Sequence, residues 1–308
     1  MTENGGKINT ETHEGVLVNA AYLNLLSENG LSSFESFISI PIKKVVKKVR
    51  DDRHTGLIKL ISNGKPVSAY LKVSNYSWLA NFFKTIRKFT RQRSSLVHEY
   101  LNLVRLREIG VPSITPIAAG TRRKGFKCES FILTQDLGDT RKLEDYIPSE
   151  FSSPFSKEQS VRKKTLIGKI AEITRRMHEG GINHRDFYLC HLHILLKAEP
   201  WPKLFVIDLN RADRREHVGE RWKVKDLAAL NYSAPCEIFS KADRLRFLFL
   251  YLECDKLDKA KKDFIYKIVR KTEKISRHAL RSKEKDRRYM EKESQKPREG
   301  SCSKGASS

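Results

Sequence analysis

The feature that most constrains the fold is a long amphipathic segment followed at once by two short apolar segments. A capping-box pattern begins at Ser156, apolar residues then recur at helical spacing, and Gly180-Gly181 should end the helix. The segments 191–196 and 203–207 have the length and composition of strands, and a proline-rich break separates them. A long helix leading into a small hairpin is typical of a helical lobe with a two-stranded insert, not of an alternating βαβ sheet.

The first half of the chain is richer in β-forming residues. Residues 40–75 predict strands, with Asn63-Gly64 as the turn of a hairpin. A helix is expected over 94–109, and two further strand-like stretches lie around 114–119 and 130–134. We therefore expect an α+β chain with two lobes, a small β-rich N-lobe and a helical C-lobe.

The expected boundaries divide the chain into four parts. They are a disordered leader at 1–15, a β-rich N-lobe at 16–135, a helical C-lobe at 136–275 and a basic tail, helical or disordered, at 276–308. Beyond about Arg277 the last segment has too few apolar residues to bury, so we expect it to be solvated.

The charge of the chain indicates a polyanionic partner. Its 308 residues include 60 Lys and Arg against 37 Asp and Glu, a formal net charge of +23. Such an excess favours a nucleic acid, an anionic membrane face, or a phosphorylated glycan or nucleotide, and an acidic protein partner also stays open. The basic residues are not interleaved with a known nucleic-acid motif, so we expect no nucleic-acid partner.

Targeting and redox signals favour the cytoplasm. The polar start of the chain has no apolar signal-peptide core, and no apolar run approaches the roughly 20 residues of a membrane-spanning helix. The five cysteines are scattered without a C-x-x-C pair, which is typical of a protein in a reducing compartment.

Two aspartates flank the predicted hairpin of the C-lobe. Asp186 closes the stretch GINHRD, which directly follows the predicted helix and precedes the first strand, and Asp208 lies at the end of the second. At one end of a hairpin, one carboxylate could orient a hydroxyl nucleophile while the other holds Mg²⁺ on a triphosphate. Lys72 lies in the middle of a β-rich run, where a buried lysine needs an anionic partner such as Glu99 or a nucleotide phosphate.

The order of these candidates along the chain resembles the catalytic set of the protein-kinase-like fold: Lys72, Glu99, His184-Arg185-Asp186 and Asp208. Asp226 resembles the buried helix aspartate that braces the catalytic loop of that fold. Five longer strings narrow the resemblance: LREIGVPSITPIAAG, SFILTQDLGDTRKLEDY, MHEGGINHRDFYLCHLHILL, VIDLNRA and RWKVKDLAALNYS. Together, over about residues 40–275, they resemble the bacterial lipopolysaccharide core heptose kinases, within the superfamily of lipopolysaccharide and Kdo kinases.

The resemblance implies an ATP-dependent sugar kinase that uses Mg²⁺ and phosphorylates a heptose of the lipopolysaccharide inner core. It would act as a peripheral protein on the cytoplasmic face of the inner membrane, with an anionic glycolipid as substrate. The implied roles fall on ten residues: Asp186 is catalytic; His184, Arg185 and Asp226 support the loop; Lys72 and Glu99 serve the phosphates; Gln135 and Leu137 lie near the adenine; Asp208 binds the metal, with His191 beside it.

The chain departs from protein kinases in several places. His191 stands where protein kinases have a metal-binding asparagine, the metal motif reads Asp208-Leu209-Asn210, and no glycine-rich G-x-G-x-x-G loop precedes Lys72. The short interval between Asn210 and Asp226 leaves little room for an activation segment, which argues against a protein substrate. Two alternatives stay open: a kinase for another core sugar such as Kdo, and a catalytically silent kinase-like module that binds membranes. Retention of the lysine and both aspartates disfavours the silent module.

The stretch 76–93 combines large apolar and basic residues. One interpretation is an insertion whose aromatic side chains pack on the N-lobe. The other is an interfacial helix, because Trp78 and Phe82 lie on a largely apolar stripe beside Lys84 and Arg87. Whether this segment or the basic tail contacts the membrane stays open.

Overall fold

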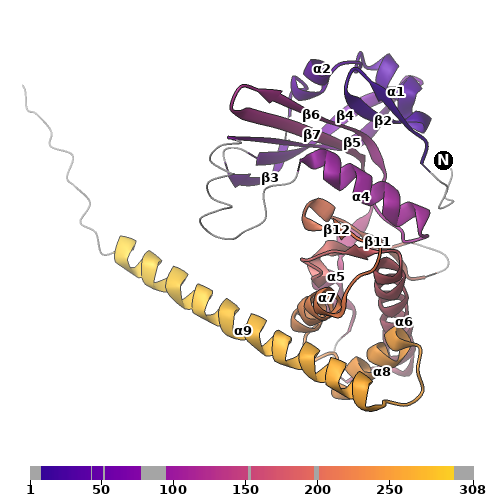
Figure 1. The fold of residues 1–308 in the computed structure, drawn as a ribbon, viewed down its shortest axis with the longest axis vertical. Coiled ribbons are helices and arrows are strands. Elements are labelled where there is room, and N and C mark those ends of the chain that lie inside the picture. The colour runs from indigo at the N-terminus through magenta and orange to yellow at the C-terminus, as the bar shows by residue number, and fades with distance from the viewer. Residues whose placement is uncertain are drawn as a thin grey trace, which may run out of the picture.

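A computed structural model describes residues 8–42, 44–50, 53–77, 95–151, 154–197 and 201–294. In these ranges the chain is α+β and two-lobed, as its sequence predicts, with a β-rich lobe above a helical lobe (Figure 1). Most of the stretch 76–93, for which an interfacial helix was considered, lies outside the described residues.

The β-rich lobe is built on a seven-stranded antiparallel sheet with the order β1-β2-β6-β7-β5-β4-β3. The strands are β1 (Thr10–His13), β2 (Val16–Asn19), β3 (Lys44–Arg50), β4 (Arg53–Ser62), β5 (Lys65–Ser77), β6 (Pro116–Lys124) and β7 (Lys127–Gln135). The predicted Asn63-Gly64 turn joins β4 to β5, and both residues adopt positive φ, at 49° and 73°. This is the turn geometry that matches the right-handed twist of a hairpin.

Three short elements, η1 (Ala20–Tyr22), α1 (Leu23–Glu28) and α2 (Phe34–Ile38), connect β2 to β3. The longer helix α4 (Leu96–Glu108) lies between the sheet and the helical lobe (Figure 1). The hydroxyl of Ser95 caps its first turn, and Leu96, Tyr100 and Leu103 on its predicted apolar face are buried.

The helical lobe contains five α-helices in the described part of the chain and several very short strands. The helices are α5 (Leu143–Glu150), α6 (Lys157–Glu179), α7 (Glu220–Ser233), α8 (Lys241–Leu252) and α9 (Lys259–Ser294). The short elements are β8 (Thr140–Lys142), β9 (Ile182–Asn183), η2 (Leu189–His191), β10 (Leu192–Leu195), β11 (Lys203–Val206), η3 (Leu209–Arg211) and β12 (Asp213–Arg214). The predicted capping box at Ser156 is present, and β10 and β11 form the predicted hairpin.

The hydrophobic core runs through both lobes. In the upper lobe, Phe131 of β7 stacks on Phe37 of α2 with ring centroids 4.5 Å apart. A second cluster joins α4, α5, α6 and the β10–β11 hairpin, so apolar side chains of the sheet, the connecting helix and the helical lobe pack as one body. This continuity holds the elements that carry the polar groups of the interlobe region in a fixed relation.

The prediction of a disordered leader over residues 1–15 is partly wrong. Thr10–His13 form the edge strand β1, paired with β2 across a two-residue turn at Glu14 and Gly15, both with positive φ. The sequence gives no strand signal here because the side chains of β1 are polar and half-buried or exposed, and backbone pairing with β2 holds the strand in the sheet.

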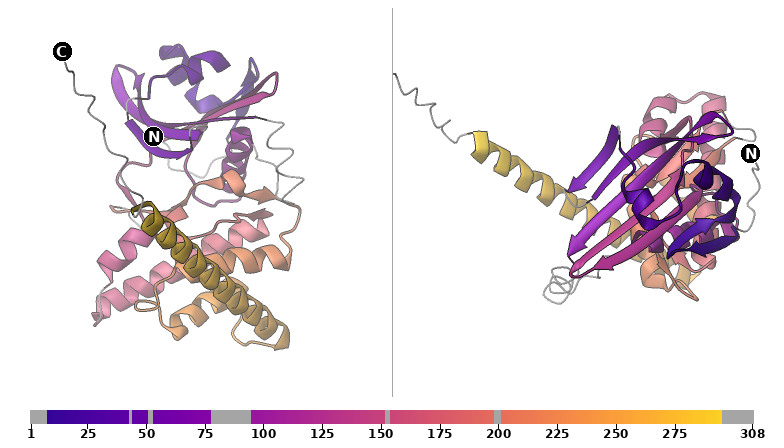
Figure 2. Two further views of the ribbon diagram at one scale, coloured as in Figure 1. Left: turned by 90° about the vertical axis from the view of Figure 1, so that its left-hand side faces the viewer. Right: turned by 90° about the horizontal axis from the view of Figure 1, so that it is seen from above.

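Helix α9 is a single helix of 36 residues, which crosses the outer face of the helical lobe and extends beyond it (Figure 2). Its first turns dock on α7 through Phe264 and Ile268. Its distal half is polar and carries ion pairs three or four positions apart, such as Glu284 with Arg287 and with Arg288. Among the residues that the structure describes, no helix has the length and apolarity needed to cross a bilayer.

Gly181 generates a stability prediction. Its φ is +81°, and a Cβ there would lie 2.1 Å from the carbonyl oxygen of Arg215, whose N–H donates to the Gly181 carbonyl. Gly181→Ala should therefore lower the free energy of unfolding by roughly 2 kcal/mol or more, through left-handed strain and the clash. Gly168→Ala, in the interior of α6 with its nearest contact at 3.9 Å, should instead raise it by roughly 0.5–1 kcal/mol. Urea denaturation of both variants checks this, and equal midpoints would contradict it.

Candidate active site

Lys72 joins the two lobes through a pair of carboxylates. It lies on β5, between β4 and β7. Its Nζ is 2.8 Å from both carboxylate oxygens of Glu99 on α4 and 3.4 Å from Oδ1 of Asp208. Glu99 is buried, so its charge has little contact with water and the ammonium is its compensating partner. Groups 27 and 136 positions away along the chain thus meet at one cation.

Asp208 lies two residues after the end of β11 and has a left-handed backbone, with φ 58° and ψ 55°. Aspartate tolerates this conformation better than most residues, because its short side chain makes local hydrogen bonds. The charge of Lys72, with those of His191 and Arg53, outweighs the effect of burial and holds the pKa of Asp208 well below its usual range. Its side chain is 31% exposed, so an ionised carboxylate lies open to a ligand.

The loop that carries Asp186 is held by a buried carboxylate. Asp226 on α7 is 0% exposed and accepts hydrogen bonds from the backbone N–H groups of His184 and Arg185, each at 2.7 Å. Arg185 has a φ of +71°, a conformation that costs an L-residue roughly 1–2 kcal/mol. The two short hydrogen bonds hold the loop in this strained shape.

The side chain of His184 ties the same loop to the end of the hairpin. It is fully buried, and its Nε2 donates to the carbonyl oxygen of Ile207 at 3.0 Å. Burial lowers the pKa of His184, so the neutral imidazole is the stable form there. Because Ile207 directly precedes Asp208, this contact fixes the spacing between the two loops that carry the aspartates.

Asp186 forms an ion pair with Arg211, a residue that the sequence did not indicate. Nη1 of Arg211 donates to both carboxylate oxygens of Asp186, at 2.9 and 2.7 Å. Arg211 belongs to the string VIDLNRA, so the motif contained it, but arginine on a polar turn carries no signal of its own. The Asp186 side chain is 25% exposed, which leaves room for a further ligand at the carboxylate.

His191 lies between the two aspartates. Its Nδ1 is 2.7 Å from the backbone carbonyl oxygen of Asp186, and its Nε2 is 3.7 Å from Oδ2 of Asp208. Burial works against protonation, but hydrogen bonds with Cys190 and that carbonyl, together with the Asp208 charge, raise the pKa of His191 to about 9. At 3.7 Å from Oδ2 of Asp208, His191 lies within reach of that carboxylate, and its expected place beside the metal stays a prediction.

Gln135 and Leu137 lie where the sheet connects to the helical lobe, between β7 and β8. The Gln135 side chain accepts a hydrogen bond from the hydroxyl of Tyr22 at 3.0 Å, and its backbone N–H donates to Thr115. Both residues are half-buried. A second interlobe contact that the sequence did not indicate joins Arg53 of β4 to the side chain of Asn210, at 3.2 Å.

The donor set around Asp208 suits a cation that arrives with its own ligands. Within the described ranges, no group of three His, Cys, Asp or Glu residues could hold a metal ion by itself. Mg²⁺ in phosphate-transfer sites typically uses one or two carboxylates, with phosphate oxygens and water completing its shell. Asp208 supplies one ionised oxygen donor, and the cations around it suit a bound polyphosphate, so the residues fit Mg²⁺ delivered with a nucleotide.

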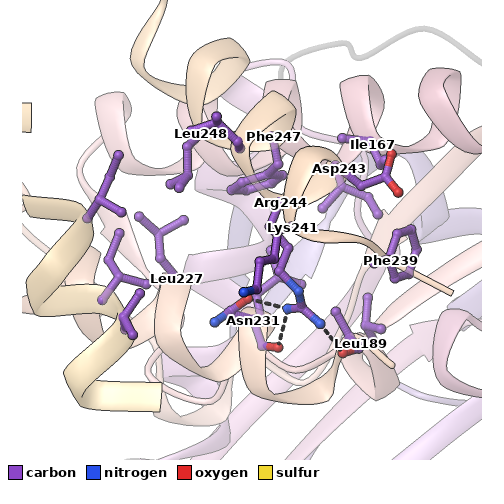
Figure 3. A pocket seen from close by; sticks show the side chains of 17 residues that line it. Ile167, Leu189, Leu227, Asn231, Phe239, Lys241, Asp243, Arg244, Phe247 and Leu248 are labelled. Carbon is purple, nitrogen blue, oxygen red and sulfur yellow. Dashed lines mark hydrogen bonds between the residues drawn. The ribbon is translucent and has the colours of Figure 1, made fainter. Parts of the chain in front are cut away.

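A separate apolar cavity of about 360 Å³ lies among α6, α7, α8 and α9 (Figure 3). Aliphatic and aromatic side chains such as Leu227, Phe239 and Phe247 line it. Polar groups lie at one side, where Arg244 donates to the carbonyl oxygen of Asn231 at 2.9 Å and to that of Ala234 at 2.8 Å. No catalytic candidate from the sequence lines this cavity.

The sequence of the chain matches known lipopolysaccharide kinases. The lipopolysaccharide core heptose(I) kinase WaaP of Escherichia coli is 35% identical over 189 residues, which cover 60% of this chain and 70% of that protein. The 3-deoxy-D-manno-octulosonic acid kinase of Vibrio cholerae serotype O1 is 26% identical over 147 residues, or 48% of this chain and 56% of that protein.

A solved structure, described as WaaP in complex with acyl carrier protein, is similar to most of this chain. Its TM-score is 0.64 at 26% identity, over 87% of this chain and 99% of the solved chain. The profile of the lipopolysaccharide kinase (Kdo/WaaP) family matches residues 70–251, a span that begins just before Lys72 and contains Asp186, Asp208 and Asp226. The chain therefore belongs to the lipopolysaccharide kinase (Kdo/WaaP) family.

Proposed function

We propose that this kinase transfers the γ-phosphate of ATP to a heptose of the lipopolysaccharide inner core. The observation that carries the proposal is the meeting of Lys72, Glu99 and Asp208 within 3.4 Å, beside Asp186, in a chain of this family. Support for heptose over Kdo comes from the higher identity to the heptose(I) kinase of Escherichia coli than to the Kdo kinase of Vibrio cholerae.

In the proposed reaction, each polar residue has a distinct task. Lys72, oriented by Glu99, binds phosphate oxygens, and Asp208 holds Mg²⁺, which supplies charge neutralisation on the phosphates when bound. The heptose hydroxyl oxygen forms a bond to the γ-phosphorus while the bond to the β–γ bridging oxygen breaks, and ADP leaves with that electron pair. The hydroxyl proton passes to the Asp186 carboxylate, which Arg211 orients.

Two aspartate variants test this assignment. Asp186→Asn keeps the shape of the side chain but removes the proton acceptor, so kcat should fall by about 10²–10⁴. Asp208→Asn removes one negative charge from the metal site and should raise the Mg²⁺ concentration needed for half-maximal rate. The measurement is transfer of labelled phosphate from ATP to purified core-truncated lipopolysaccharide that retains heptose, compared with one that ends at Kdo.

Asp255→Asn, an exposed aspartate between α8 and α9, is the matched control and should leave both kcat and the Mg²⁺ curve unchanged. A folded Asp186→Asn variant with the parent rate would remove that residue from the mechanism. Phosphate transfer only to the acceptor that ends at Kdo would show that Kdo, not heptose, is the sugar phosphorylated.

We also propose that the protein works as a peripheral protein on the cytoplasmic face of the inner membrane. Arg277, Arg281, Lys285 and Arg288 are exposed and recur at the spacing of one helical face on distal α9, which extends past the lobes (Figure 2). Near an anionic leaflet, each such cation contributes about 1 kcal/mol, and salt screens the attraction.

Replacing these four residues with Gln should weaken sedimentation with anionic vesicles at low salt, with neutral vesicles as the reference. Activity on a lipid-free oligosaccharide should not change. Binding equal to that of the parent would exclude this face of α9 and leave the segment 76–93 as the basic candidate.

An acyl carrier protein is a further proposed partner. A similar structure is described as a complex with that protein, and a chain with net charge +23 suits an acidic partner. The apolar cavity in the helical lobe has the chemistry to accept an alkyl chain, and Lys241 and Arg244 line its polar side.

Ala234→Phe should fill part of this cavity and abolish the preference for acylated over unacylated carrier protein. Val161→Phe, at a 61% exposed site on α6 outside the cavity, is the matched control and should bind both forms like the parent. Kd values from calorimetry measure both. The acyl-binding role is wrong if the parent itself does not distinguish the two forms of the carrier.

A further inference from the structure

A second polar site lies next to the catalytic loop, and apart from Arg185 its residues have no part in the roles assigned so far. It is an open groove of about 920 Å³ between α4, the β9–β12 region and the start of α7. Its lining is dominated by cationic side chains around one aromatic ring: Arg105, Arg185, Arg214, Arg215, Arg221 and Trp222. We call this set the arginine groove.

Trp222 gathers the cations of the arginine groove. The guanidinium of Arg215 lies 4.8 Å from the ring centroid, and those of Arg185 and Arg221 each lie 5.4 Å from it. The Nζ of Lys225 lies 5.9 Å from the same centroid. An aromatic face attracts each cation, but it does not neutralise charge, so the repulsion among these groups remains.

The carboxylates of the arginine groove do not balance these charges. Asp213 is 6% exposed and is bound internally, with its Oδ2 at 3.0 Å from Arg215 and 3.5 Å from Arg185. Glu216 is the other acidic lining residue and is exposed. Five arginines against two carboxylates make the groove an anion site, and planar guanidinium groups are suited to bidentate contacts with carboxylate or phosphate.

The arginine groove shares Arg185 with the loop that carries the candidate catalytic base. Arg185 directly precedes Asp186, and Arg211 binds its carboxylate. Burial first, and then the charges of Arg185 and Arg211, lower the pKa of Lys225, while the carboxylates of Asp186 and Asp226 act in the opposite direction. An anion in the groove would therefore be bound close to the hydroxyl that Asp186 serves.

We infer that the arginine groove binds a carboxylate or phosphate of the acceptor glycan and so positions the sugar whose hydroxyl meets Asp186. This inference rests on the proposed function, because it requires an anionic glycan as the acceptor. The arginine groove is distinct from the Lys72–Asp208 site that would serve the nucleotide. It would make acceptor recognition depend on a charged group that does not itself react.

The test uses the full-length double variant Arg214→Gln/Arg221→Gln. Both side chains are exposed and line the groove without a structural ion pair to another described residue, so the fold should persist. With lipid-free core oligosaccharide, the KM and Kd for the acceptor should rise about tenfold, because two charge contacts with its anionic group are lost. The kcat and the KM for ATP should not change. Arg123→Gln/Lys124→Gln, at the tip of the β6–β7 hairpin, is the matched control with the same charge removed.

Modified acceptors identify the anion. One acceptor has its carboxylates reduced to alcohols, and another has its phosphates removed. If the removed group is the one that the arginine groove binds, its removal should weaken binding to the parent about tenfold. It should not weaken binding to the double variant any further, because that variant has already lost the contact. Calorimetric titration with inorganic phosphate shows whether the arginine groove binds a free anion, as opposed to an anionic group on the acceptor.

The inference is overturned if the double variant binds the oligosaccharide as the parent does. It is also overturned if inorganic phosphate needs the two arginines while both modified acceptors bind the parent normally, since the arginine groove would then hold a free anion. If the parent transfers no phosphate to any core acceptor but still binds the oligosaccharide through these arginines, the proposed function fails and the groove stands. If it neither transfers phosphate nor binds the oligosaccharide, both fail.

Discussion

The buried carboxylate of Asp226 is the interaction on which the rest of the site depends. Two backbone N–H groups of the catalytic loop converge on it at 2.7 Å, in surroundings from which water is excluded. A buried charge is tolerated only when it is fully hydrogen-bonded, so the loop and the helix must form together. The left-handed conformation of Arg185 follows from this constraint. It sets the direction of the chain on either side, toward Asp186 in the interlobe region and toward the arginine groove beside α7.

A second constraint acts between the lobes. Lys72 on the sheet, Glu99 on α4 and Asp208 after β11 form one charge cluster, and Asn210 contacts Arg53 of the sheet. The lysine compensates two carboxylates from different lobes. The charge of Lys72, with those of His191 and Arg53, holds the pKa of Asp208 well below its usual range. The arginine groove, with five arginines against two carboxylates, suits an anionic acceptor, while the Lys72–Asp208 site offers a cation and an ionised carboxylate to a polyphosphate donor and its metal.

Much of the fold could be predicted because its signals are local. The capping box at Ser156, the Asn63-Gly64 turn and the apolar repeat of α6 each depend on residues within a few positions. Strand β1 could not be predicted in this way, because its side chains are polar and its stability comes from pairing with β2. The identities of Lys72, Glu99, Asp186 and Asp208 as candidates came from the order of motifs. The part played by Arg211 did not, since an arginine in a polar turn looks the same whether it faces water or a carboxylate.

The sequence by itself determined the α+β class, the order of the elements, the excess of positive charge and the residue types available for chemistry. These properties follow from composition and short-range pattern, and no distance is needed to read them. Only the tertiary structure decided that His191 lies beside Asp208, that Arg211 binds Asp186, and that arginines from three separate segments gather around Trp222. The physical reason is that a charge acts on its neighbours over a few ångströms of space. The fold brings groups such as Lys72 and Asp208, 136 positions apart along the chain, within that range.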